Sequence, residues 1–158
     1  MADKVPMTKL GFDRLEEELK NLKSIERPAV VKAIAAAREH GDLSENAEYS
    51  AARERQSFIE GRVEELEYKI SHADVIDVSK LDGKDVKFGA TVTLIDDDSS
   101  EKVVYQIVGE DEADIKAGLL SVTSPLARAL IGKQVKDTVE VNTPKGGKSY
   151  EIERVAFK

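Results

Sequence analysis

Residues 30–52 read VVKAIAAAREHGDLSENAEYSAA, and they decide the fold of the first half of the chain. Apolar residues recur at helical spacing in the first part of this stretch, and Gly41 then follows as a natural C-cap. Asp42, with Glu45 three residues later, forms a capping-box pattern for a second helix. Two helices joined by such a short polar connection predict an antiparallel helical hairpin with its tip near residues 40–49.

The helical spacing extends outward on both sides of this stretch. Upstream, Thr8 is a predicted N-cap, and it is followed by an apolar stripe formed by Phe12, Leu15, Leu19 and Leu22. Pro28 interrupts the pattern, and it either starts a new helix or kinks one long helix. Downstream, the second helix is expected to run to about Ala73, with a stripe formed by Ala52, Ile59, Val63, Leu66 and Ile70. About 29 residues at roughly 1.5 Å each make a rod on the order of 43 Å long.

The periodicity changes near residue 80, and this change predicts two domains, residues 1–79 and residues 80–158. Residues 74–88 indicate a linker or an early strand. β-branched and alternating segments predict strands at 89–95, 103–108, 135–142 and 149–157, and a short helix with proline at N1 is predicted over 124–130. The predicted fold class is therefore α+β, with an N-terminal antiparallel α-helical coiled-coil hairpin and a compact, mostly β C-terminal domain.

Composition excludes several classes of function. The 158 residues include no cysteine and only two histidines, which excludes disulfides, thiol nucleophiles, zinc ribbons and iron–sulfur sites. The net charge of −7 argues against a protein that coats nucleic acid by bulk electrostatics. No apolar run approaches the roughly 18 residues of a membrane span, and no signal-peptide pattern opens the chain. We therefore expect a soluble, cytoplasmic protein with no membrane contact.

Three patterns that resemble binding sites have simpler explanations. Residues 147–149 (GKS) lack the earlier glycine of a phosphate-binding loop and predict a β-hairpin turn. His40 lies near a predicted helix C-terminus without a second nitrogen ligand, so we expect a surface histidine. The acidic clusters at 110–114 and 96–98 lack the spacing of a calcium loop, and solvated loops are predicted there.

Asp42 and Glu45 allow two interpretations. As a capping box they satisfy amide donors at the start of the second helix and need no further function. Alternatively, two carboxylates one turn apart, with Asn46 beside them, can share a hard cation such as Mg²⁺. That site would be weak unless a partner supplied the remaining ligands.

The residues around this pair carry a resemblance to a known family. Residues 36–49 (AAREHGDLSENAEY) resemble the tip of the bacterial transcript-cleavage factors of the GreA/GreB family. Further segments resemble the same family in the same order: 6–8 (PMT), 27–28 (RP), 51–54 (AARE), 88–92 (FGATV), 108–114 (VGEDEAD) and 124–133 (SPLARALIGK). The resemblance covers about residues 6 to 157, and motifs of this length in one order are specific.

The resemblance implies a coiled-coil hairpin joined to a C-terminal domain similar to FKBP-type folds. It implies a monomer that binds RNA polymerase, inserts the hairpin through the secondary channel and stimulates cleavage of backtracked nascent RNA. The polymerase would perform the chemistry, and the factor would not be an enzyme by itself. No tightly bound cofactor is implied, because the Mg²⁺ is shared with the polymerase active site.

The resemblance also implies roles for individual residues. Asp42 and Glu45 match the carboxylates that help to hold the second Mg²⁺ and position water. The matches for RNA and tip contacts are Arg38, Asn46, Tyr49 and Arg53. The matches for the loop that docks on the polymerase are Ser124, Pro125 and Leu126.

Two other functions remain open from the sequence. An inhibitory paralogue of the same architecture would occupy the channel without promoting cleavage, although the intact Asp42 and Glu45 pair argues against it. A stand-alone prolyl isomerase or chaperone would use the FKBP-like domain, but residues 80–158 offer only four aromatic side chains for a proline pocket. Within the family, the net charge of −5 on residues 1–79 favours the GreA branch over the more basic GreB branch.

Overall fold

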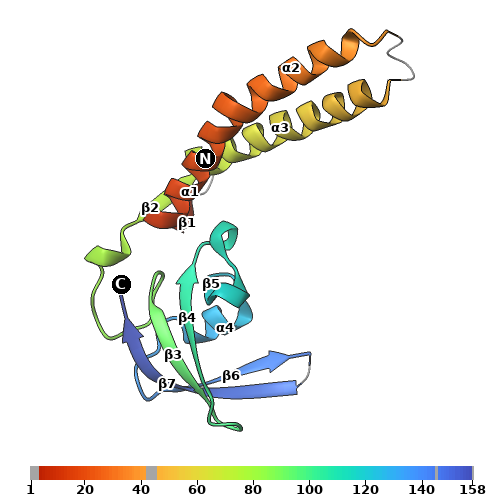
Figure 1. Cartoon of the computed structure of the whole chain (residues 1–158). Coiled ribbons are helices and arrows are strands. Elements are labelled where there is room, and N and C mark those ends of the chain that lie inside the picture. The colour runs from red at the N-terminus through yellow and green to blue at the C-terminus, as the bar shows by residue number, and fades with distance from the viewer. Residues whose placement is uncertain (1–3, 42–45, 145, 158) are drawn as a thin grey trace. The chain divides into compact units, whose positions relative to one another are not determined.

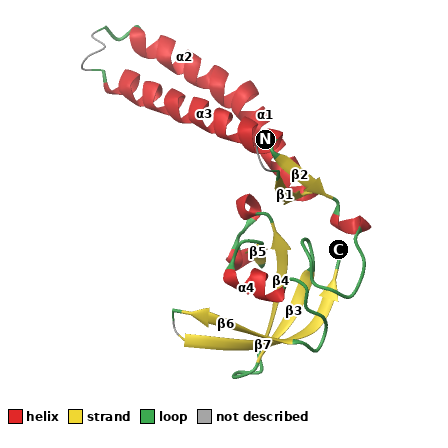
Figure 2. Ribbon diagram, turned by 180° about the vertical axis from the view of Figure 1, so that it is seen from behind, coloured by secondary structure: helices red, strands yellow, loops and turns green. Residues whose placement is uncertain are grey.

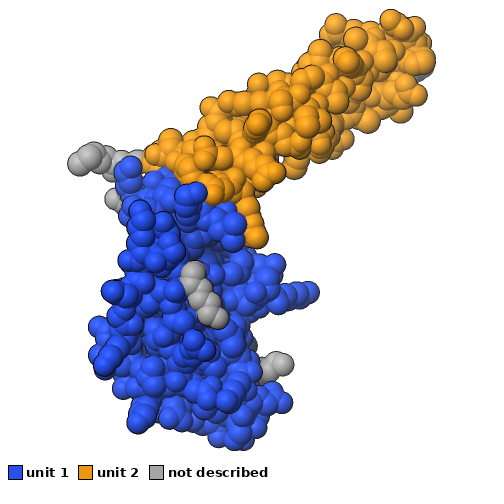
Figure 3. Space-filling view, turned by 60° about the vertical axis from the view of Figure 1, so that its left-hand side comes forward, with its two compact units in different colours: residues 1–11, 73–158 blue, residues 12–72 orange. Residues whose placement is uncertain are grey.

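A computed structural model describes residues 4–41, 46–144 and 146–157. The chain divides into two compact units, which are coloured separately in Figure 3. We call residues 12–72 the hairpin unit, and residues 1–11 together with 73–158 the C-terminal unit. This division differs from the predicted boundary at residue 80, because residues 1–11 and 73–79 belong to the C-terminal unit.

The hairpin unit consists of two helical arms, one before and one after the tip, that run antiparallel to each other (Figure 1). Its helical segments are α1 (Lys9–Asn21), which starts in the C-terminal unit, a π-helical segment (Leu22–Glu26), α2 (Arg27–Arg38) and α3 (Ala47–Ser71). The predicted helical hairpin is thus confirmed. The second helix has 25 residues rather than the 29 that the sequence predicted.

The chain stays helical through Pro28, because α1, the π-helical segment and α2 follow one another without a gap. Pro28 occupies the first turn of α2, where its missing N–H costs little. The turn before it is π-helical, and the amide of Arg27 donates to the carbonyl of Leu22. A proline ring crowds the carbonyl four residues earlier, so the wider π turn accommodates Pro28 without a break.

Apolar packing and ion pairs hold the hairpin unit together. Its buried core is formed by Leu22, Val30, Ile59, Val63 and Leu66, with Leu15 and Leu19 packed against it. Arg62 of α3 donates two hydrogen bonds, of 2.6 and 2.8 Å, to the Glu18 carboxylate of α1. These bonds hold the pKa of Glu18 below its ordinary value. Most members of the two predicted apolar stripes lie in or against this core: Leu15, Leu19, Leu22, Ile59, Val63 and Leu66.

The C-terminal unit contains two sheets (Figure 2). In the smaller, β1 (Val5–Thr8) pairs in parallel with β2 (Ala73–Ile76). In the larger, the strand order is β5-β4-β3-β7-β6. Its strands are β3 (Thr91–Asp96), β4 (Lys102–Val108), β5 (Leu119–Ser121), β6 (Thr138–Thr143) and β7 (Gly146–Ala156). The mostly β domain is confirmed. The segment 74–88, for which a linker or an early strand was predicted, begins inside the strand β2, which spans Ala73–Ile76.

The larger sheet packs against the short helix α4 (Pro125–Leu130). Leu94, Ile107, Leu130 and Ile152 are among the fully buried side chains of this core. Short 3₁₀ turns lie at Val78–Lys80, Glu110–Glu112 and Ile115–Ala117. Among the residues that the structure describes, no helix combines the length and apolar character that crossing a membrane requires.

Candidate functional site

The hairpin tip is bounded by the end of α2 and the start of α3. After Arg38 the chain turns through Gly41, whose φ of +100° lies in the left-handed region that glycine tolerates best. The amide of Gly41 lies 3.4 Å from the carbonyl oxygen of Arg38, but the C-cap of α2 is Glu39, so Gly41 follows the cap instead of forming it as the sequence predicted. Asp42 and Glu45 lie outside the described residues.

Asn46 joins the two sides of the tip. Its side-chain oxygen accepts a hydrogen bond from the amide of Tyr49 at 3.0 Å, which makes Asn46 the N-cap of α3. Its side-chain nitrogen donates to the carbonyl of Ala37 at 2.6 Å, near the end of α2. One side chain therefore caps the second helix and ties it to the first.

This arrangement corrects the capping-box prediction. The sequence placed the start of the second helix directly after Asp42, whereas α3 begins at Ala47 behind the extended residue Asn46. Asparagine is as good an N-cap as aspartate, so local preference did not distinguish the two positions. Asn46 is therefore the N-cap of α3 in place of the predicted Asp42.

The remaining predicted tip residues lie on the two helices that flank the tip. Arg38 is the last residue of α2, and Arg53 lies in the second turn of α3. Both side chains are exposed, and within the described ranges neither forms an ion pair. Tyr49 is half-buried in the first turn of α3. His40, an exposed histidine as predicted, lies with its Nε2 3.4 Å from a Glu48 carboxylate oxygen.

The three predicted docking residues have different environments at the start of α4. The Ser124 hydroxyl accepts from the amide of Ala127 at 3.2 Å and donates to the carbonyl of Ser121 at 2.7 Å. Leu126 packs against the core of the sheet. Pro125 is the exposed member of the trio. Ser124 and Leu126 thus shape the loop, and Pro125 presents its surface to solvent.

Two acidic residues that the sequence assigned to solvated loops have structural roles, and for them that prediction was wrong. The Asp96 side chain accepts from the amides of Asp98 and Ser99 at 2.9 and 3.3 Å. The amide of Asp98 is the main reason why the pKa of Asp96 is lowered. Glu112 accepts hydrogen bonds from the amides of Thr8 and Gly109. Nothing local reveals the Glu112 contact to Thr8, which lies 104 residues away.

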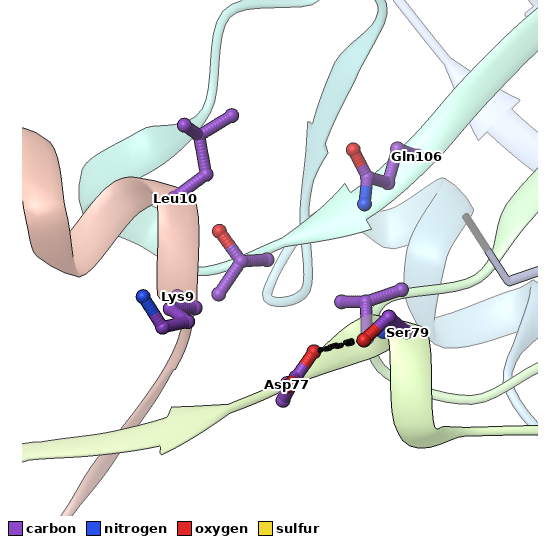
Figure 4. Close-up of a pocket in the computed structure, with 7 residues that line it drawn as sticks. Lys9, Leu10, Asp77, Ser79 and Gln106 are labelled. Carbon is purple, nitrogen blue, oxygen red and sulfur yellow. Dashed lines mark hydrogen bonds between the residues drawn. The ribbon is translucent and has the colours of Figure 1, made fainter.

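A cavity of about 210 Å³ lies in the C-terminal unit, beside the start of α1 (Figure 4). Lys9, Asp77, Ser79 and Gln106 are among its lining residues. Asp77 accepts from the hydroxyl and the amide of Ser79 at 2.6 and 3.1 Å, and these bonds lower its pKa. Within the described part of the chain, no group of three or more histidine and carboxylate side chains could hold a metal ion.

Comparison with known proteins gives two family matches and several close relatives. The model described as "Transcription elongation factor, N-terminal" matches residues 5–75, and "Transcription elongation factor, GreA/GreB, C-term" matches residues 81–157. Proteins named transcription elongation factor GreA from Phenylobacterium zucineum and Beijerinckia indica are 66% and 65% identical to this chain. The aligned regions cover 98% and 99% of this chain, respectively, and 99% of each relative. The crystal structure of the GreA factor homolog 1 protein of Thermus thermophilus is 27% identical, with a TM-score of 0.44, and covers 97% of this chain and 99% of that one.

Proposed function

We infer the function of this chain from one premise: it belongs to the GreA/GreB family of transcription elongation factors. It binds RNA polymerase, inserts the helical hairpin into the secondary channel and stimulates endonucleolytic cleavage at the 3′ end of backtracked RNA. The chain is an activator in trans and the polymerase carries out the reaction. Rescue of arrested elongation complexes follows from this activity.

Asp42 and Glu45 are the residues through which the hairpin acts. Two carboxylates offer the oxygen ligands that Mg²⁺ prefers, but they are too few for a complete site, so the polymerase and the RNA supply the rest. When bound, a second metal ion would lower the pKa of the attacking water or stabilise the leaving oxygen. The residues of this chain deliver and orient the two carboxylates at the polymerase active centre.

The observation that carries this proposal is the capping of α3 by Asn46. The simpler interpretation of Asp42 and Glu45 is that they satisfy the first amide groups of the second helix. Asn46 accepts from the amide of Tyr49 and anchors to the carbonyl of Ala37 instead. The presence of two carboxylates beside this cap is then better explained by a ligand.

Arg38 and Arg53 suit contact with RNA phosphates. Each guanidinium is exposed and forms no ion pair with a described residue. An arginine beside a phosphate forms a charge-assisted contact that fixes position without reading sequence. Such local contacts are compatible with the net charge of −7, because the main partner is a protein.

The C-terminal unit provides docking, with Pro125 as the contact surface and Ser124 and Leu126 as its support. The stand-alone isomerase alternative would need a proline pocket lined by aromatic side chains. Tyr105, Tyr150 and Phe157 lie partly buried against the core of the sheet. No observation favours this second function.

The proposal is tested with a stalled, backtracked elongation complex that carries labelled RNA. The wild-type chain should shorten the RNA from its 3′ end in the presence of Mg²⁺, and Asp42→Asn and Glu45→Gln should each abolish this stimulation. Both variants should still compete with the wild type for polymerase. A wild-type chain that occupies the polymerase and slows synthesis without cleavage would instead identify an inhibitory paralogue.

A further inference from the structure

The first turn of α1 is capped by two residues from distant parts of the chain. Thr8, which is 6% exposed, precedes the helix, and its hydroxyl oxygen accepts from the amide of Gly11 at 3.1 Å. Thr8 is therefore the N-cap, as the sequence predicted, and Gly11 occupies the third helical position, N3. In a local capping box, a glutamate at N3 would reach back to the amide of the N-cap residue.

Here the carboxylate that reaches the amide of Thr8 belongs to Glu112, which is 104 residues further along the chain. Its carboxylate accepts a hydrogen bond from the amide of Thr8 at 2.9 Å and a second from the Thr8 hydroxyl. It also accepts from the amide of Gly109 at 2.8 Å, within its own 3₁₀ turn. We call this set of bonds the Thr8–Glu112 clasp.

The glycine at N3 is what makes room for the clasp. A Cβ atom added to Gly11 would lie 2.2 Å from a carboxylate oxygen of Glu112, closer than any real contact. A side chain at position 11 and the present position of Glu112 therefore exclude each other. The carboxylate that reaches the amide of Thr8 therefore comes from the 3₁₀ turn after β4 and not from position N3.

The clasp lies where the chain enters the hairpin unit. The first three residues of α1, Lys9 to Gly11, belong to the C-terminal unit together with Glu112, and the helix continues beyond them into the hairpin unit. Met7, immediately before Thr8, is fully buried. The start of α1 is thus fixed to the unit that is proposed to dock on the polymerase.

We propose that Glu112 is a positioning residue for RNA cleavage, because its clasp on Thr8 anchors the root of the helix that leads to the tip. This inference rests on the proposed function. Docking should not need the clasp, because the docking loop lies elsewhere in the C-terminal unit. Delivery of the tip carboxylates should need it, since small displacements of catalytic groups reduce rates strongly.

The test compares three variants in the cleavage assay with backtracked complexes. Glu112→Ala removes the clasp. The double variant Glu112→Ala/Gly11→Glu supplies a local capping box for α1 but no tie to the 3₁₀ turn. Glu110→Ala changes an exposed carboxylate on the same turn and is the matched control. The maximal cleavage rate and the half-saturating factor concentration are measured separately, and amide exchange at Gly11 reports on the cap.

Glu112→Ala should lower the maximal cleavage rate by about tenfold while the half-saturating concentration changes by less than about twofold. The double variant should restore slow exchange at Gly11 but not the rate, and Glu110→Ala should match the wild type. Recovery of the rate in the double variant would overturn the inference, because helix capping alone would then suffice. A full rate for Glu112→Ala would also overturn it.

Two further outcomes are distinguishable. If Glu112→Ala is poorly folded, Glu112→Gln serves instead. It keeps one oxygen acceptor for the amide of Thr8, and it should show an intermediate rate at unchanged binding; a wild-type rate would count against the inference. If the wild-type chain stimulates no cleavage, the proposed function fails as a whole, whereas equal stimulation by all variants rejects only the role of Glu112.

Discussion

Replacement of Asn46 by alanine should loosen the hairpin tip by a predictable amount. The change removes the N-cap bond to the amide of Tyr49, a loss that costs about 1 kcal/mol. It also removes the bond to the carbonyl of Ala37, which contributes about 1 kcal/mol more. The first turn of α3 should therefore open more easily by about 2 kcal/mol, or roughly 30-fold in the opening equilibrium.

Amide hydrogen exchange of the full chain measures this opening at single residues. The amide of Ser50 donates to the backbone carbonyl of Asn46, so its exchange reports on the first turn. Asn46→Asp is the matched control, because it keeps an oxygen for the cap but loses the donor to Ala37. It should accelerate exchange at Ser50 by about fivefold, corresponding to the loss of one bond of about 1 kcal/mol.

The same two variants connect the tip to function. Cleavage stimulation should fall in the order wild type, Asn46→Asp, Asn46→Ala, because a looser tip presents the neighbouring carboxylates less often in a productive arrangement. Exchange at Ser50 that is unchanged in Asn46→Ala would refute the assignment of the cap. Faster exchange with full cleavage would refute the link between tip order and activity.

Three further predictions address the rest of the chain. The bonds from Arg62 lower the pKa of Glu18, so their stabilisation is complete above about pH 4.5 and is lost as the pH falls below it. Glu18→Gln should cost about 0.5–1 kcal/mol at neutral pH and reduce the loss of helicity on acidification, measured by circular dichroism. Ser124→Ala should destabilise the start of α4 by about 1 kcal/mol and weaken competition for polymerase; unchanged competition would argue against a docking role for this loop. Replacing both Arg38 and Arg53 with alanine should reduce cleavage and crosslinking to the RNA 3′ end most in deeply backtracked complexes, without changing the Mg²⁺ dependence. A shifted Mg²⁺ requirement with an unchanged crosslink would contradict the RNA contact.

Features with local causes were predictable from the sequence. The apolar stripe that contains Leu22 repeats at helical intervals, so the packing of the helical hairpin followed from periodicity. Gly41 and Pro125 mark a helix end and a helix start, because each restricts the backbone in a known way. The β-hairpin formed by β6 and β7 followed from two alternating segments around a polar turn.

Features that depend on distant partners were not predictable. β1 and β2 have four residues each, and the whole hairpin unit separates them in the sequence, so their parallel pairing has no local signal. Glu112 looked like one acidic residue among several, because its partner Thr8 is 104 residues away. At the tip the local sequence does not identify the N-cap of α3, since Asp42 and Asn46 are equally good caps and only the fold selects Asn46.

A Mg²⁺ titration tests whether Asp42 and Glu45 hold a metal ion for RNA cleavage. Single-turnover cleavage of backtracked RNA is measured with saturating wild-type, Asp42→Asn or Glu45→Gln chain over a wide range of Mg²⁺ concentrations. Each variant should need more Mg²⁺ for half-maximal rate and should be partly rescued at high Mg²⁺, because occupancy of the ion is what it has lost. Variants that cleave at the wild-type rate, or that lose rate at every concentration without a shift in the Mg²⁺ requirement, would contradict this role of the two carboxylates.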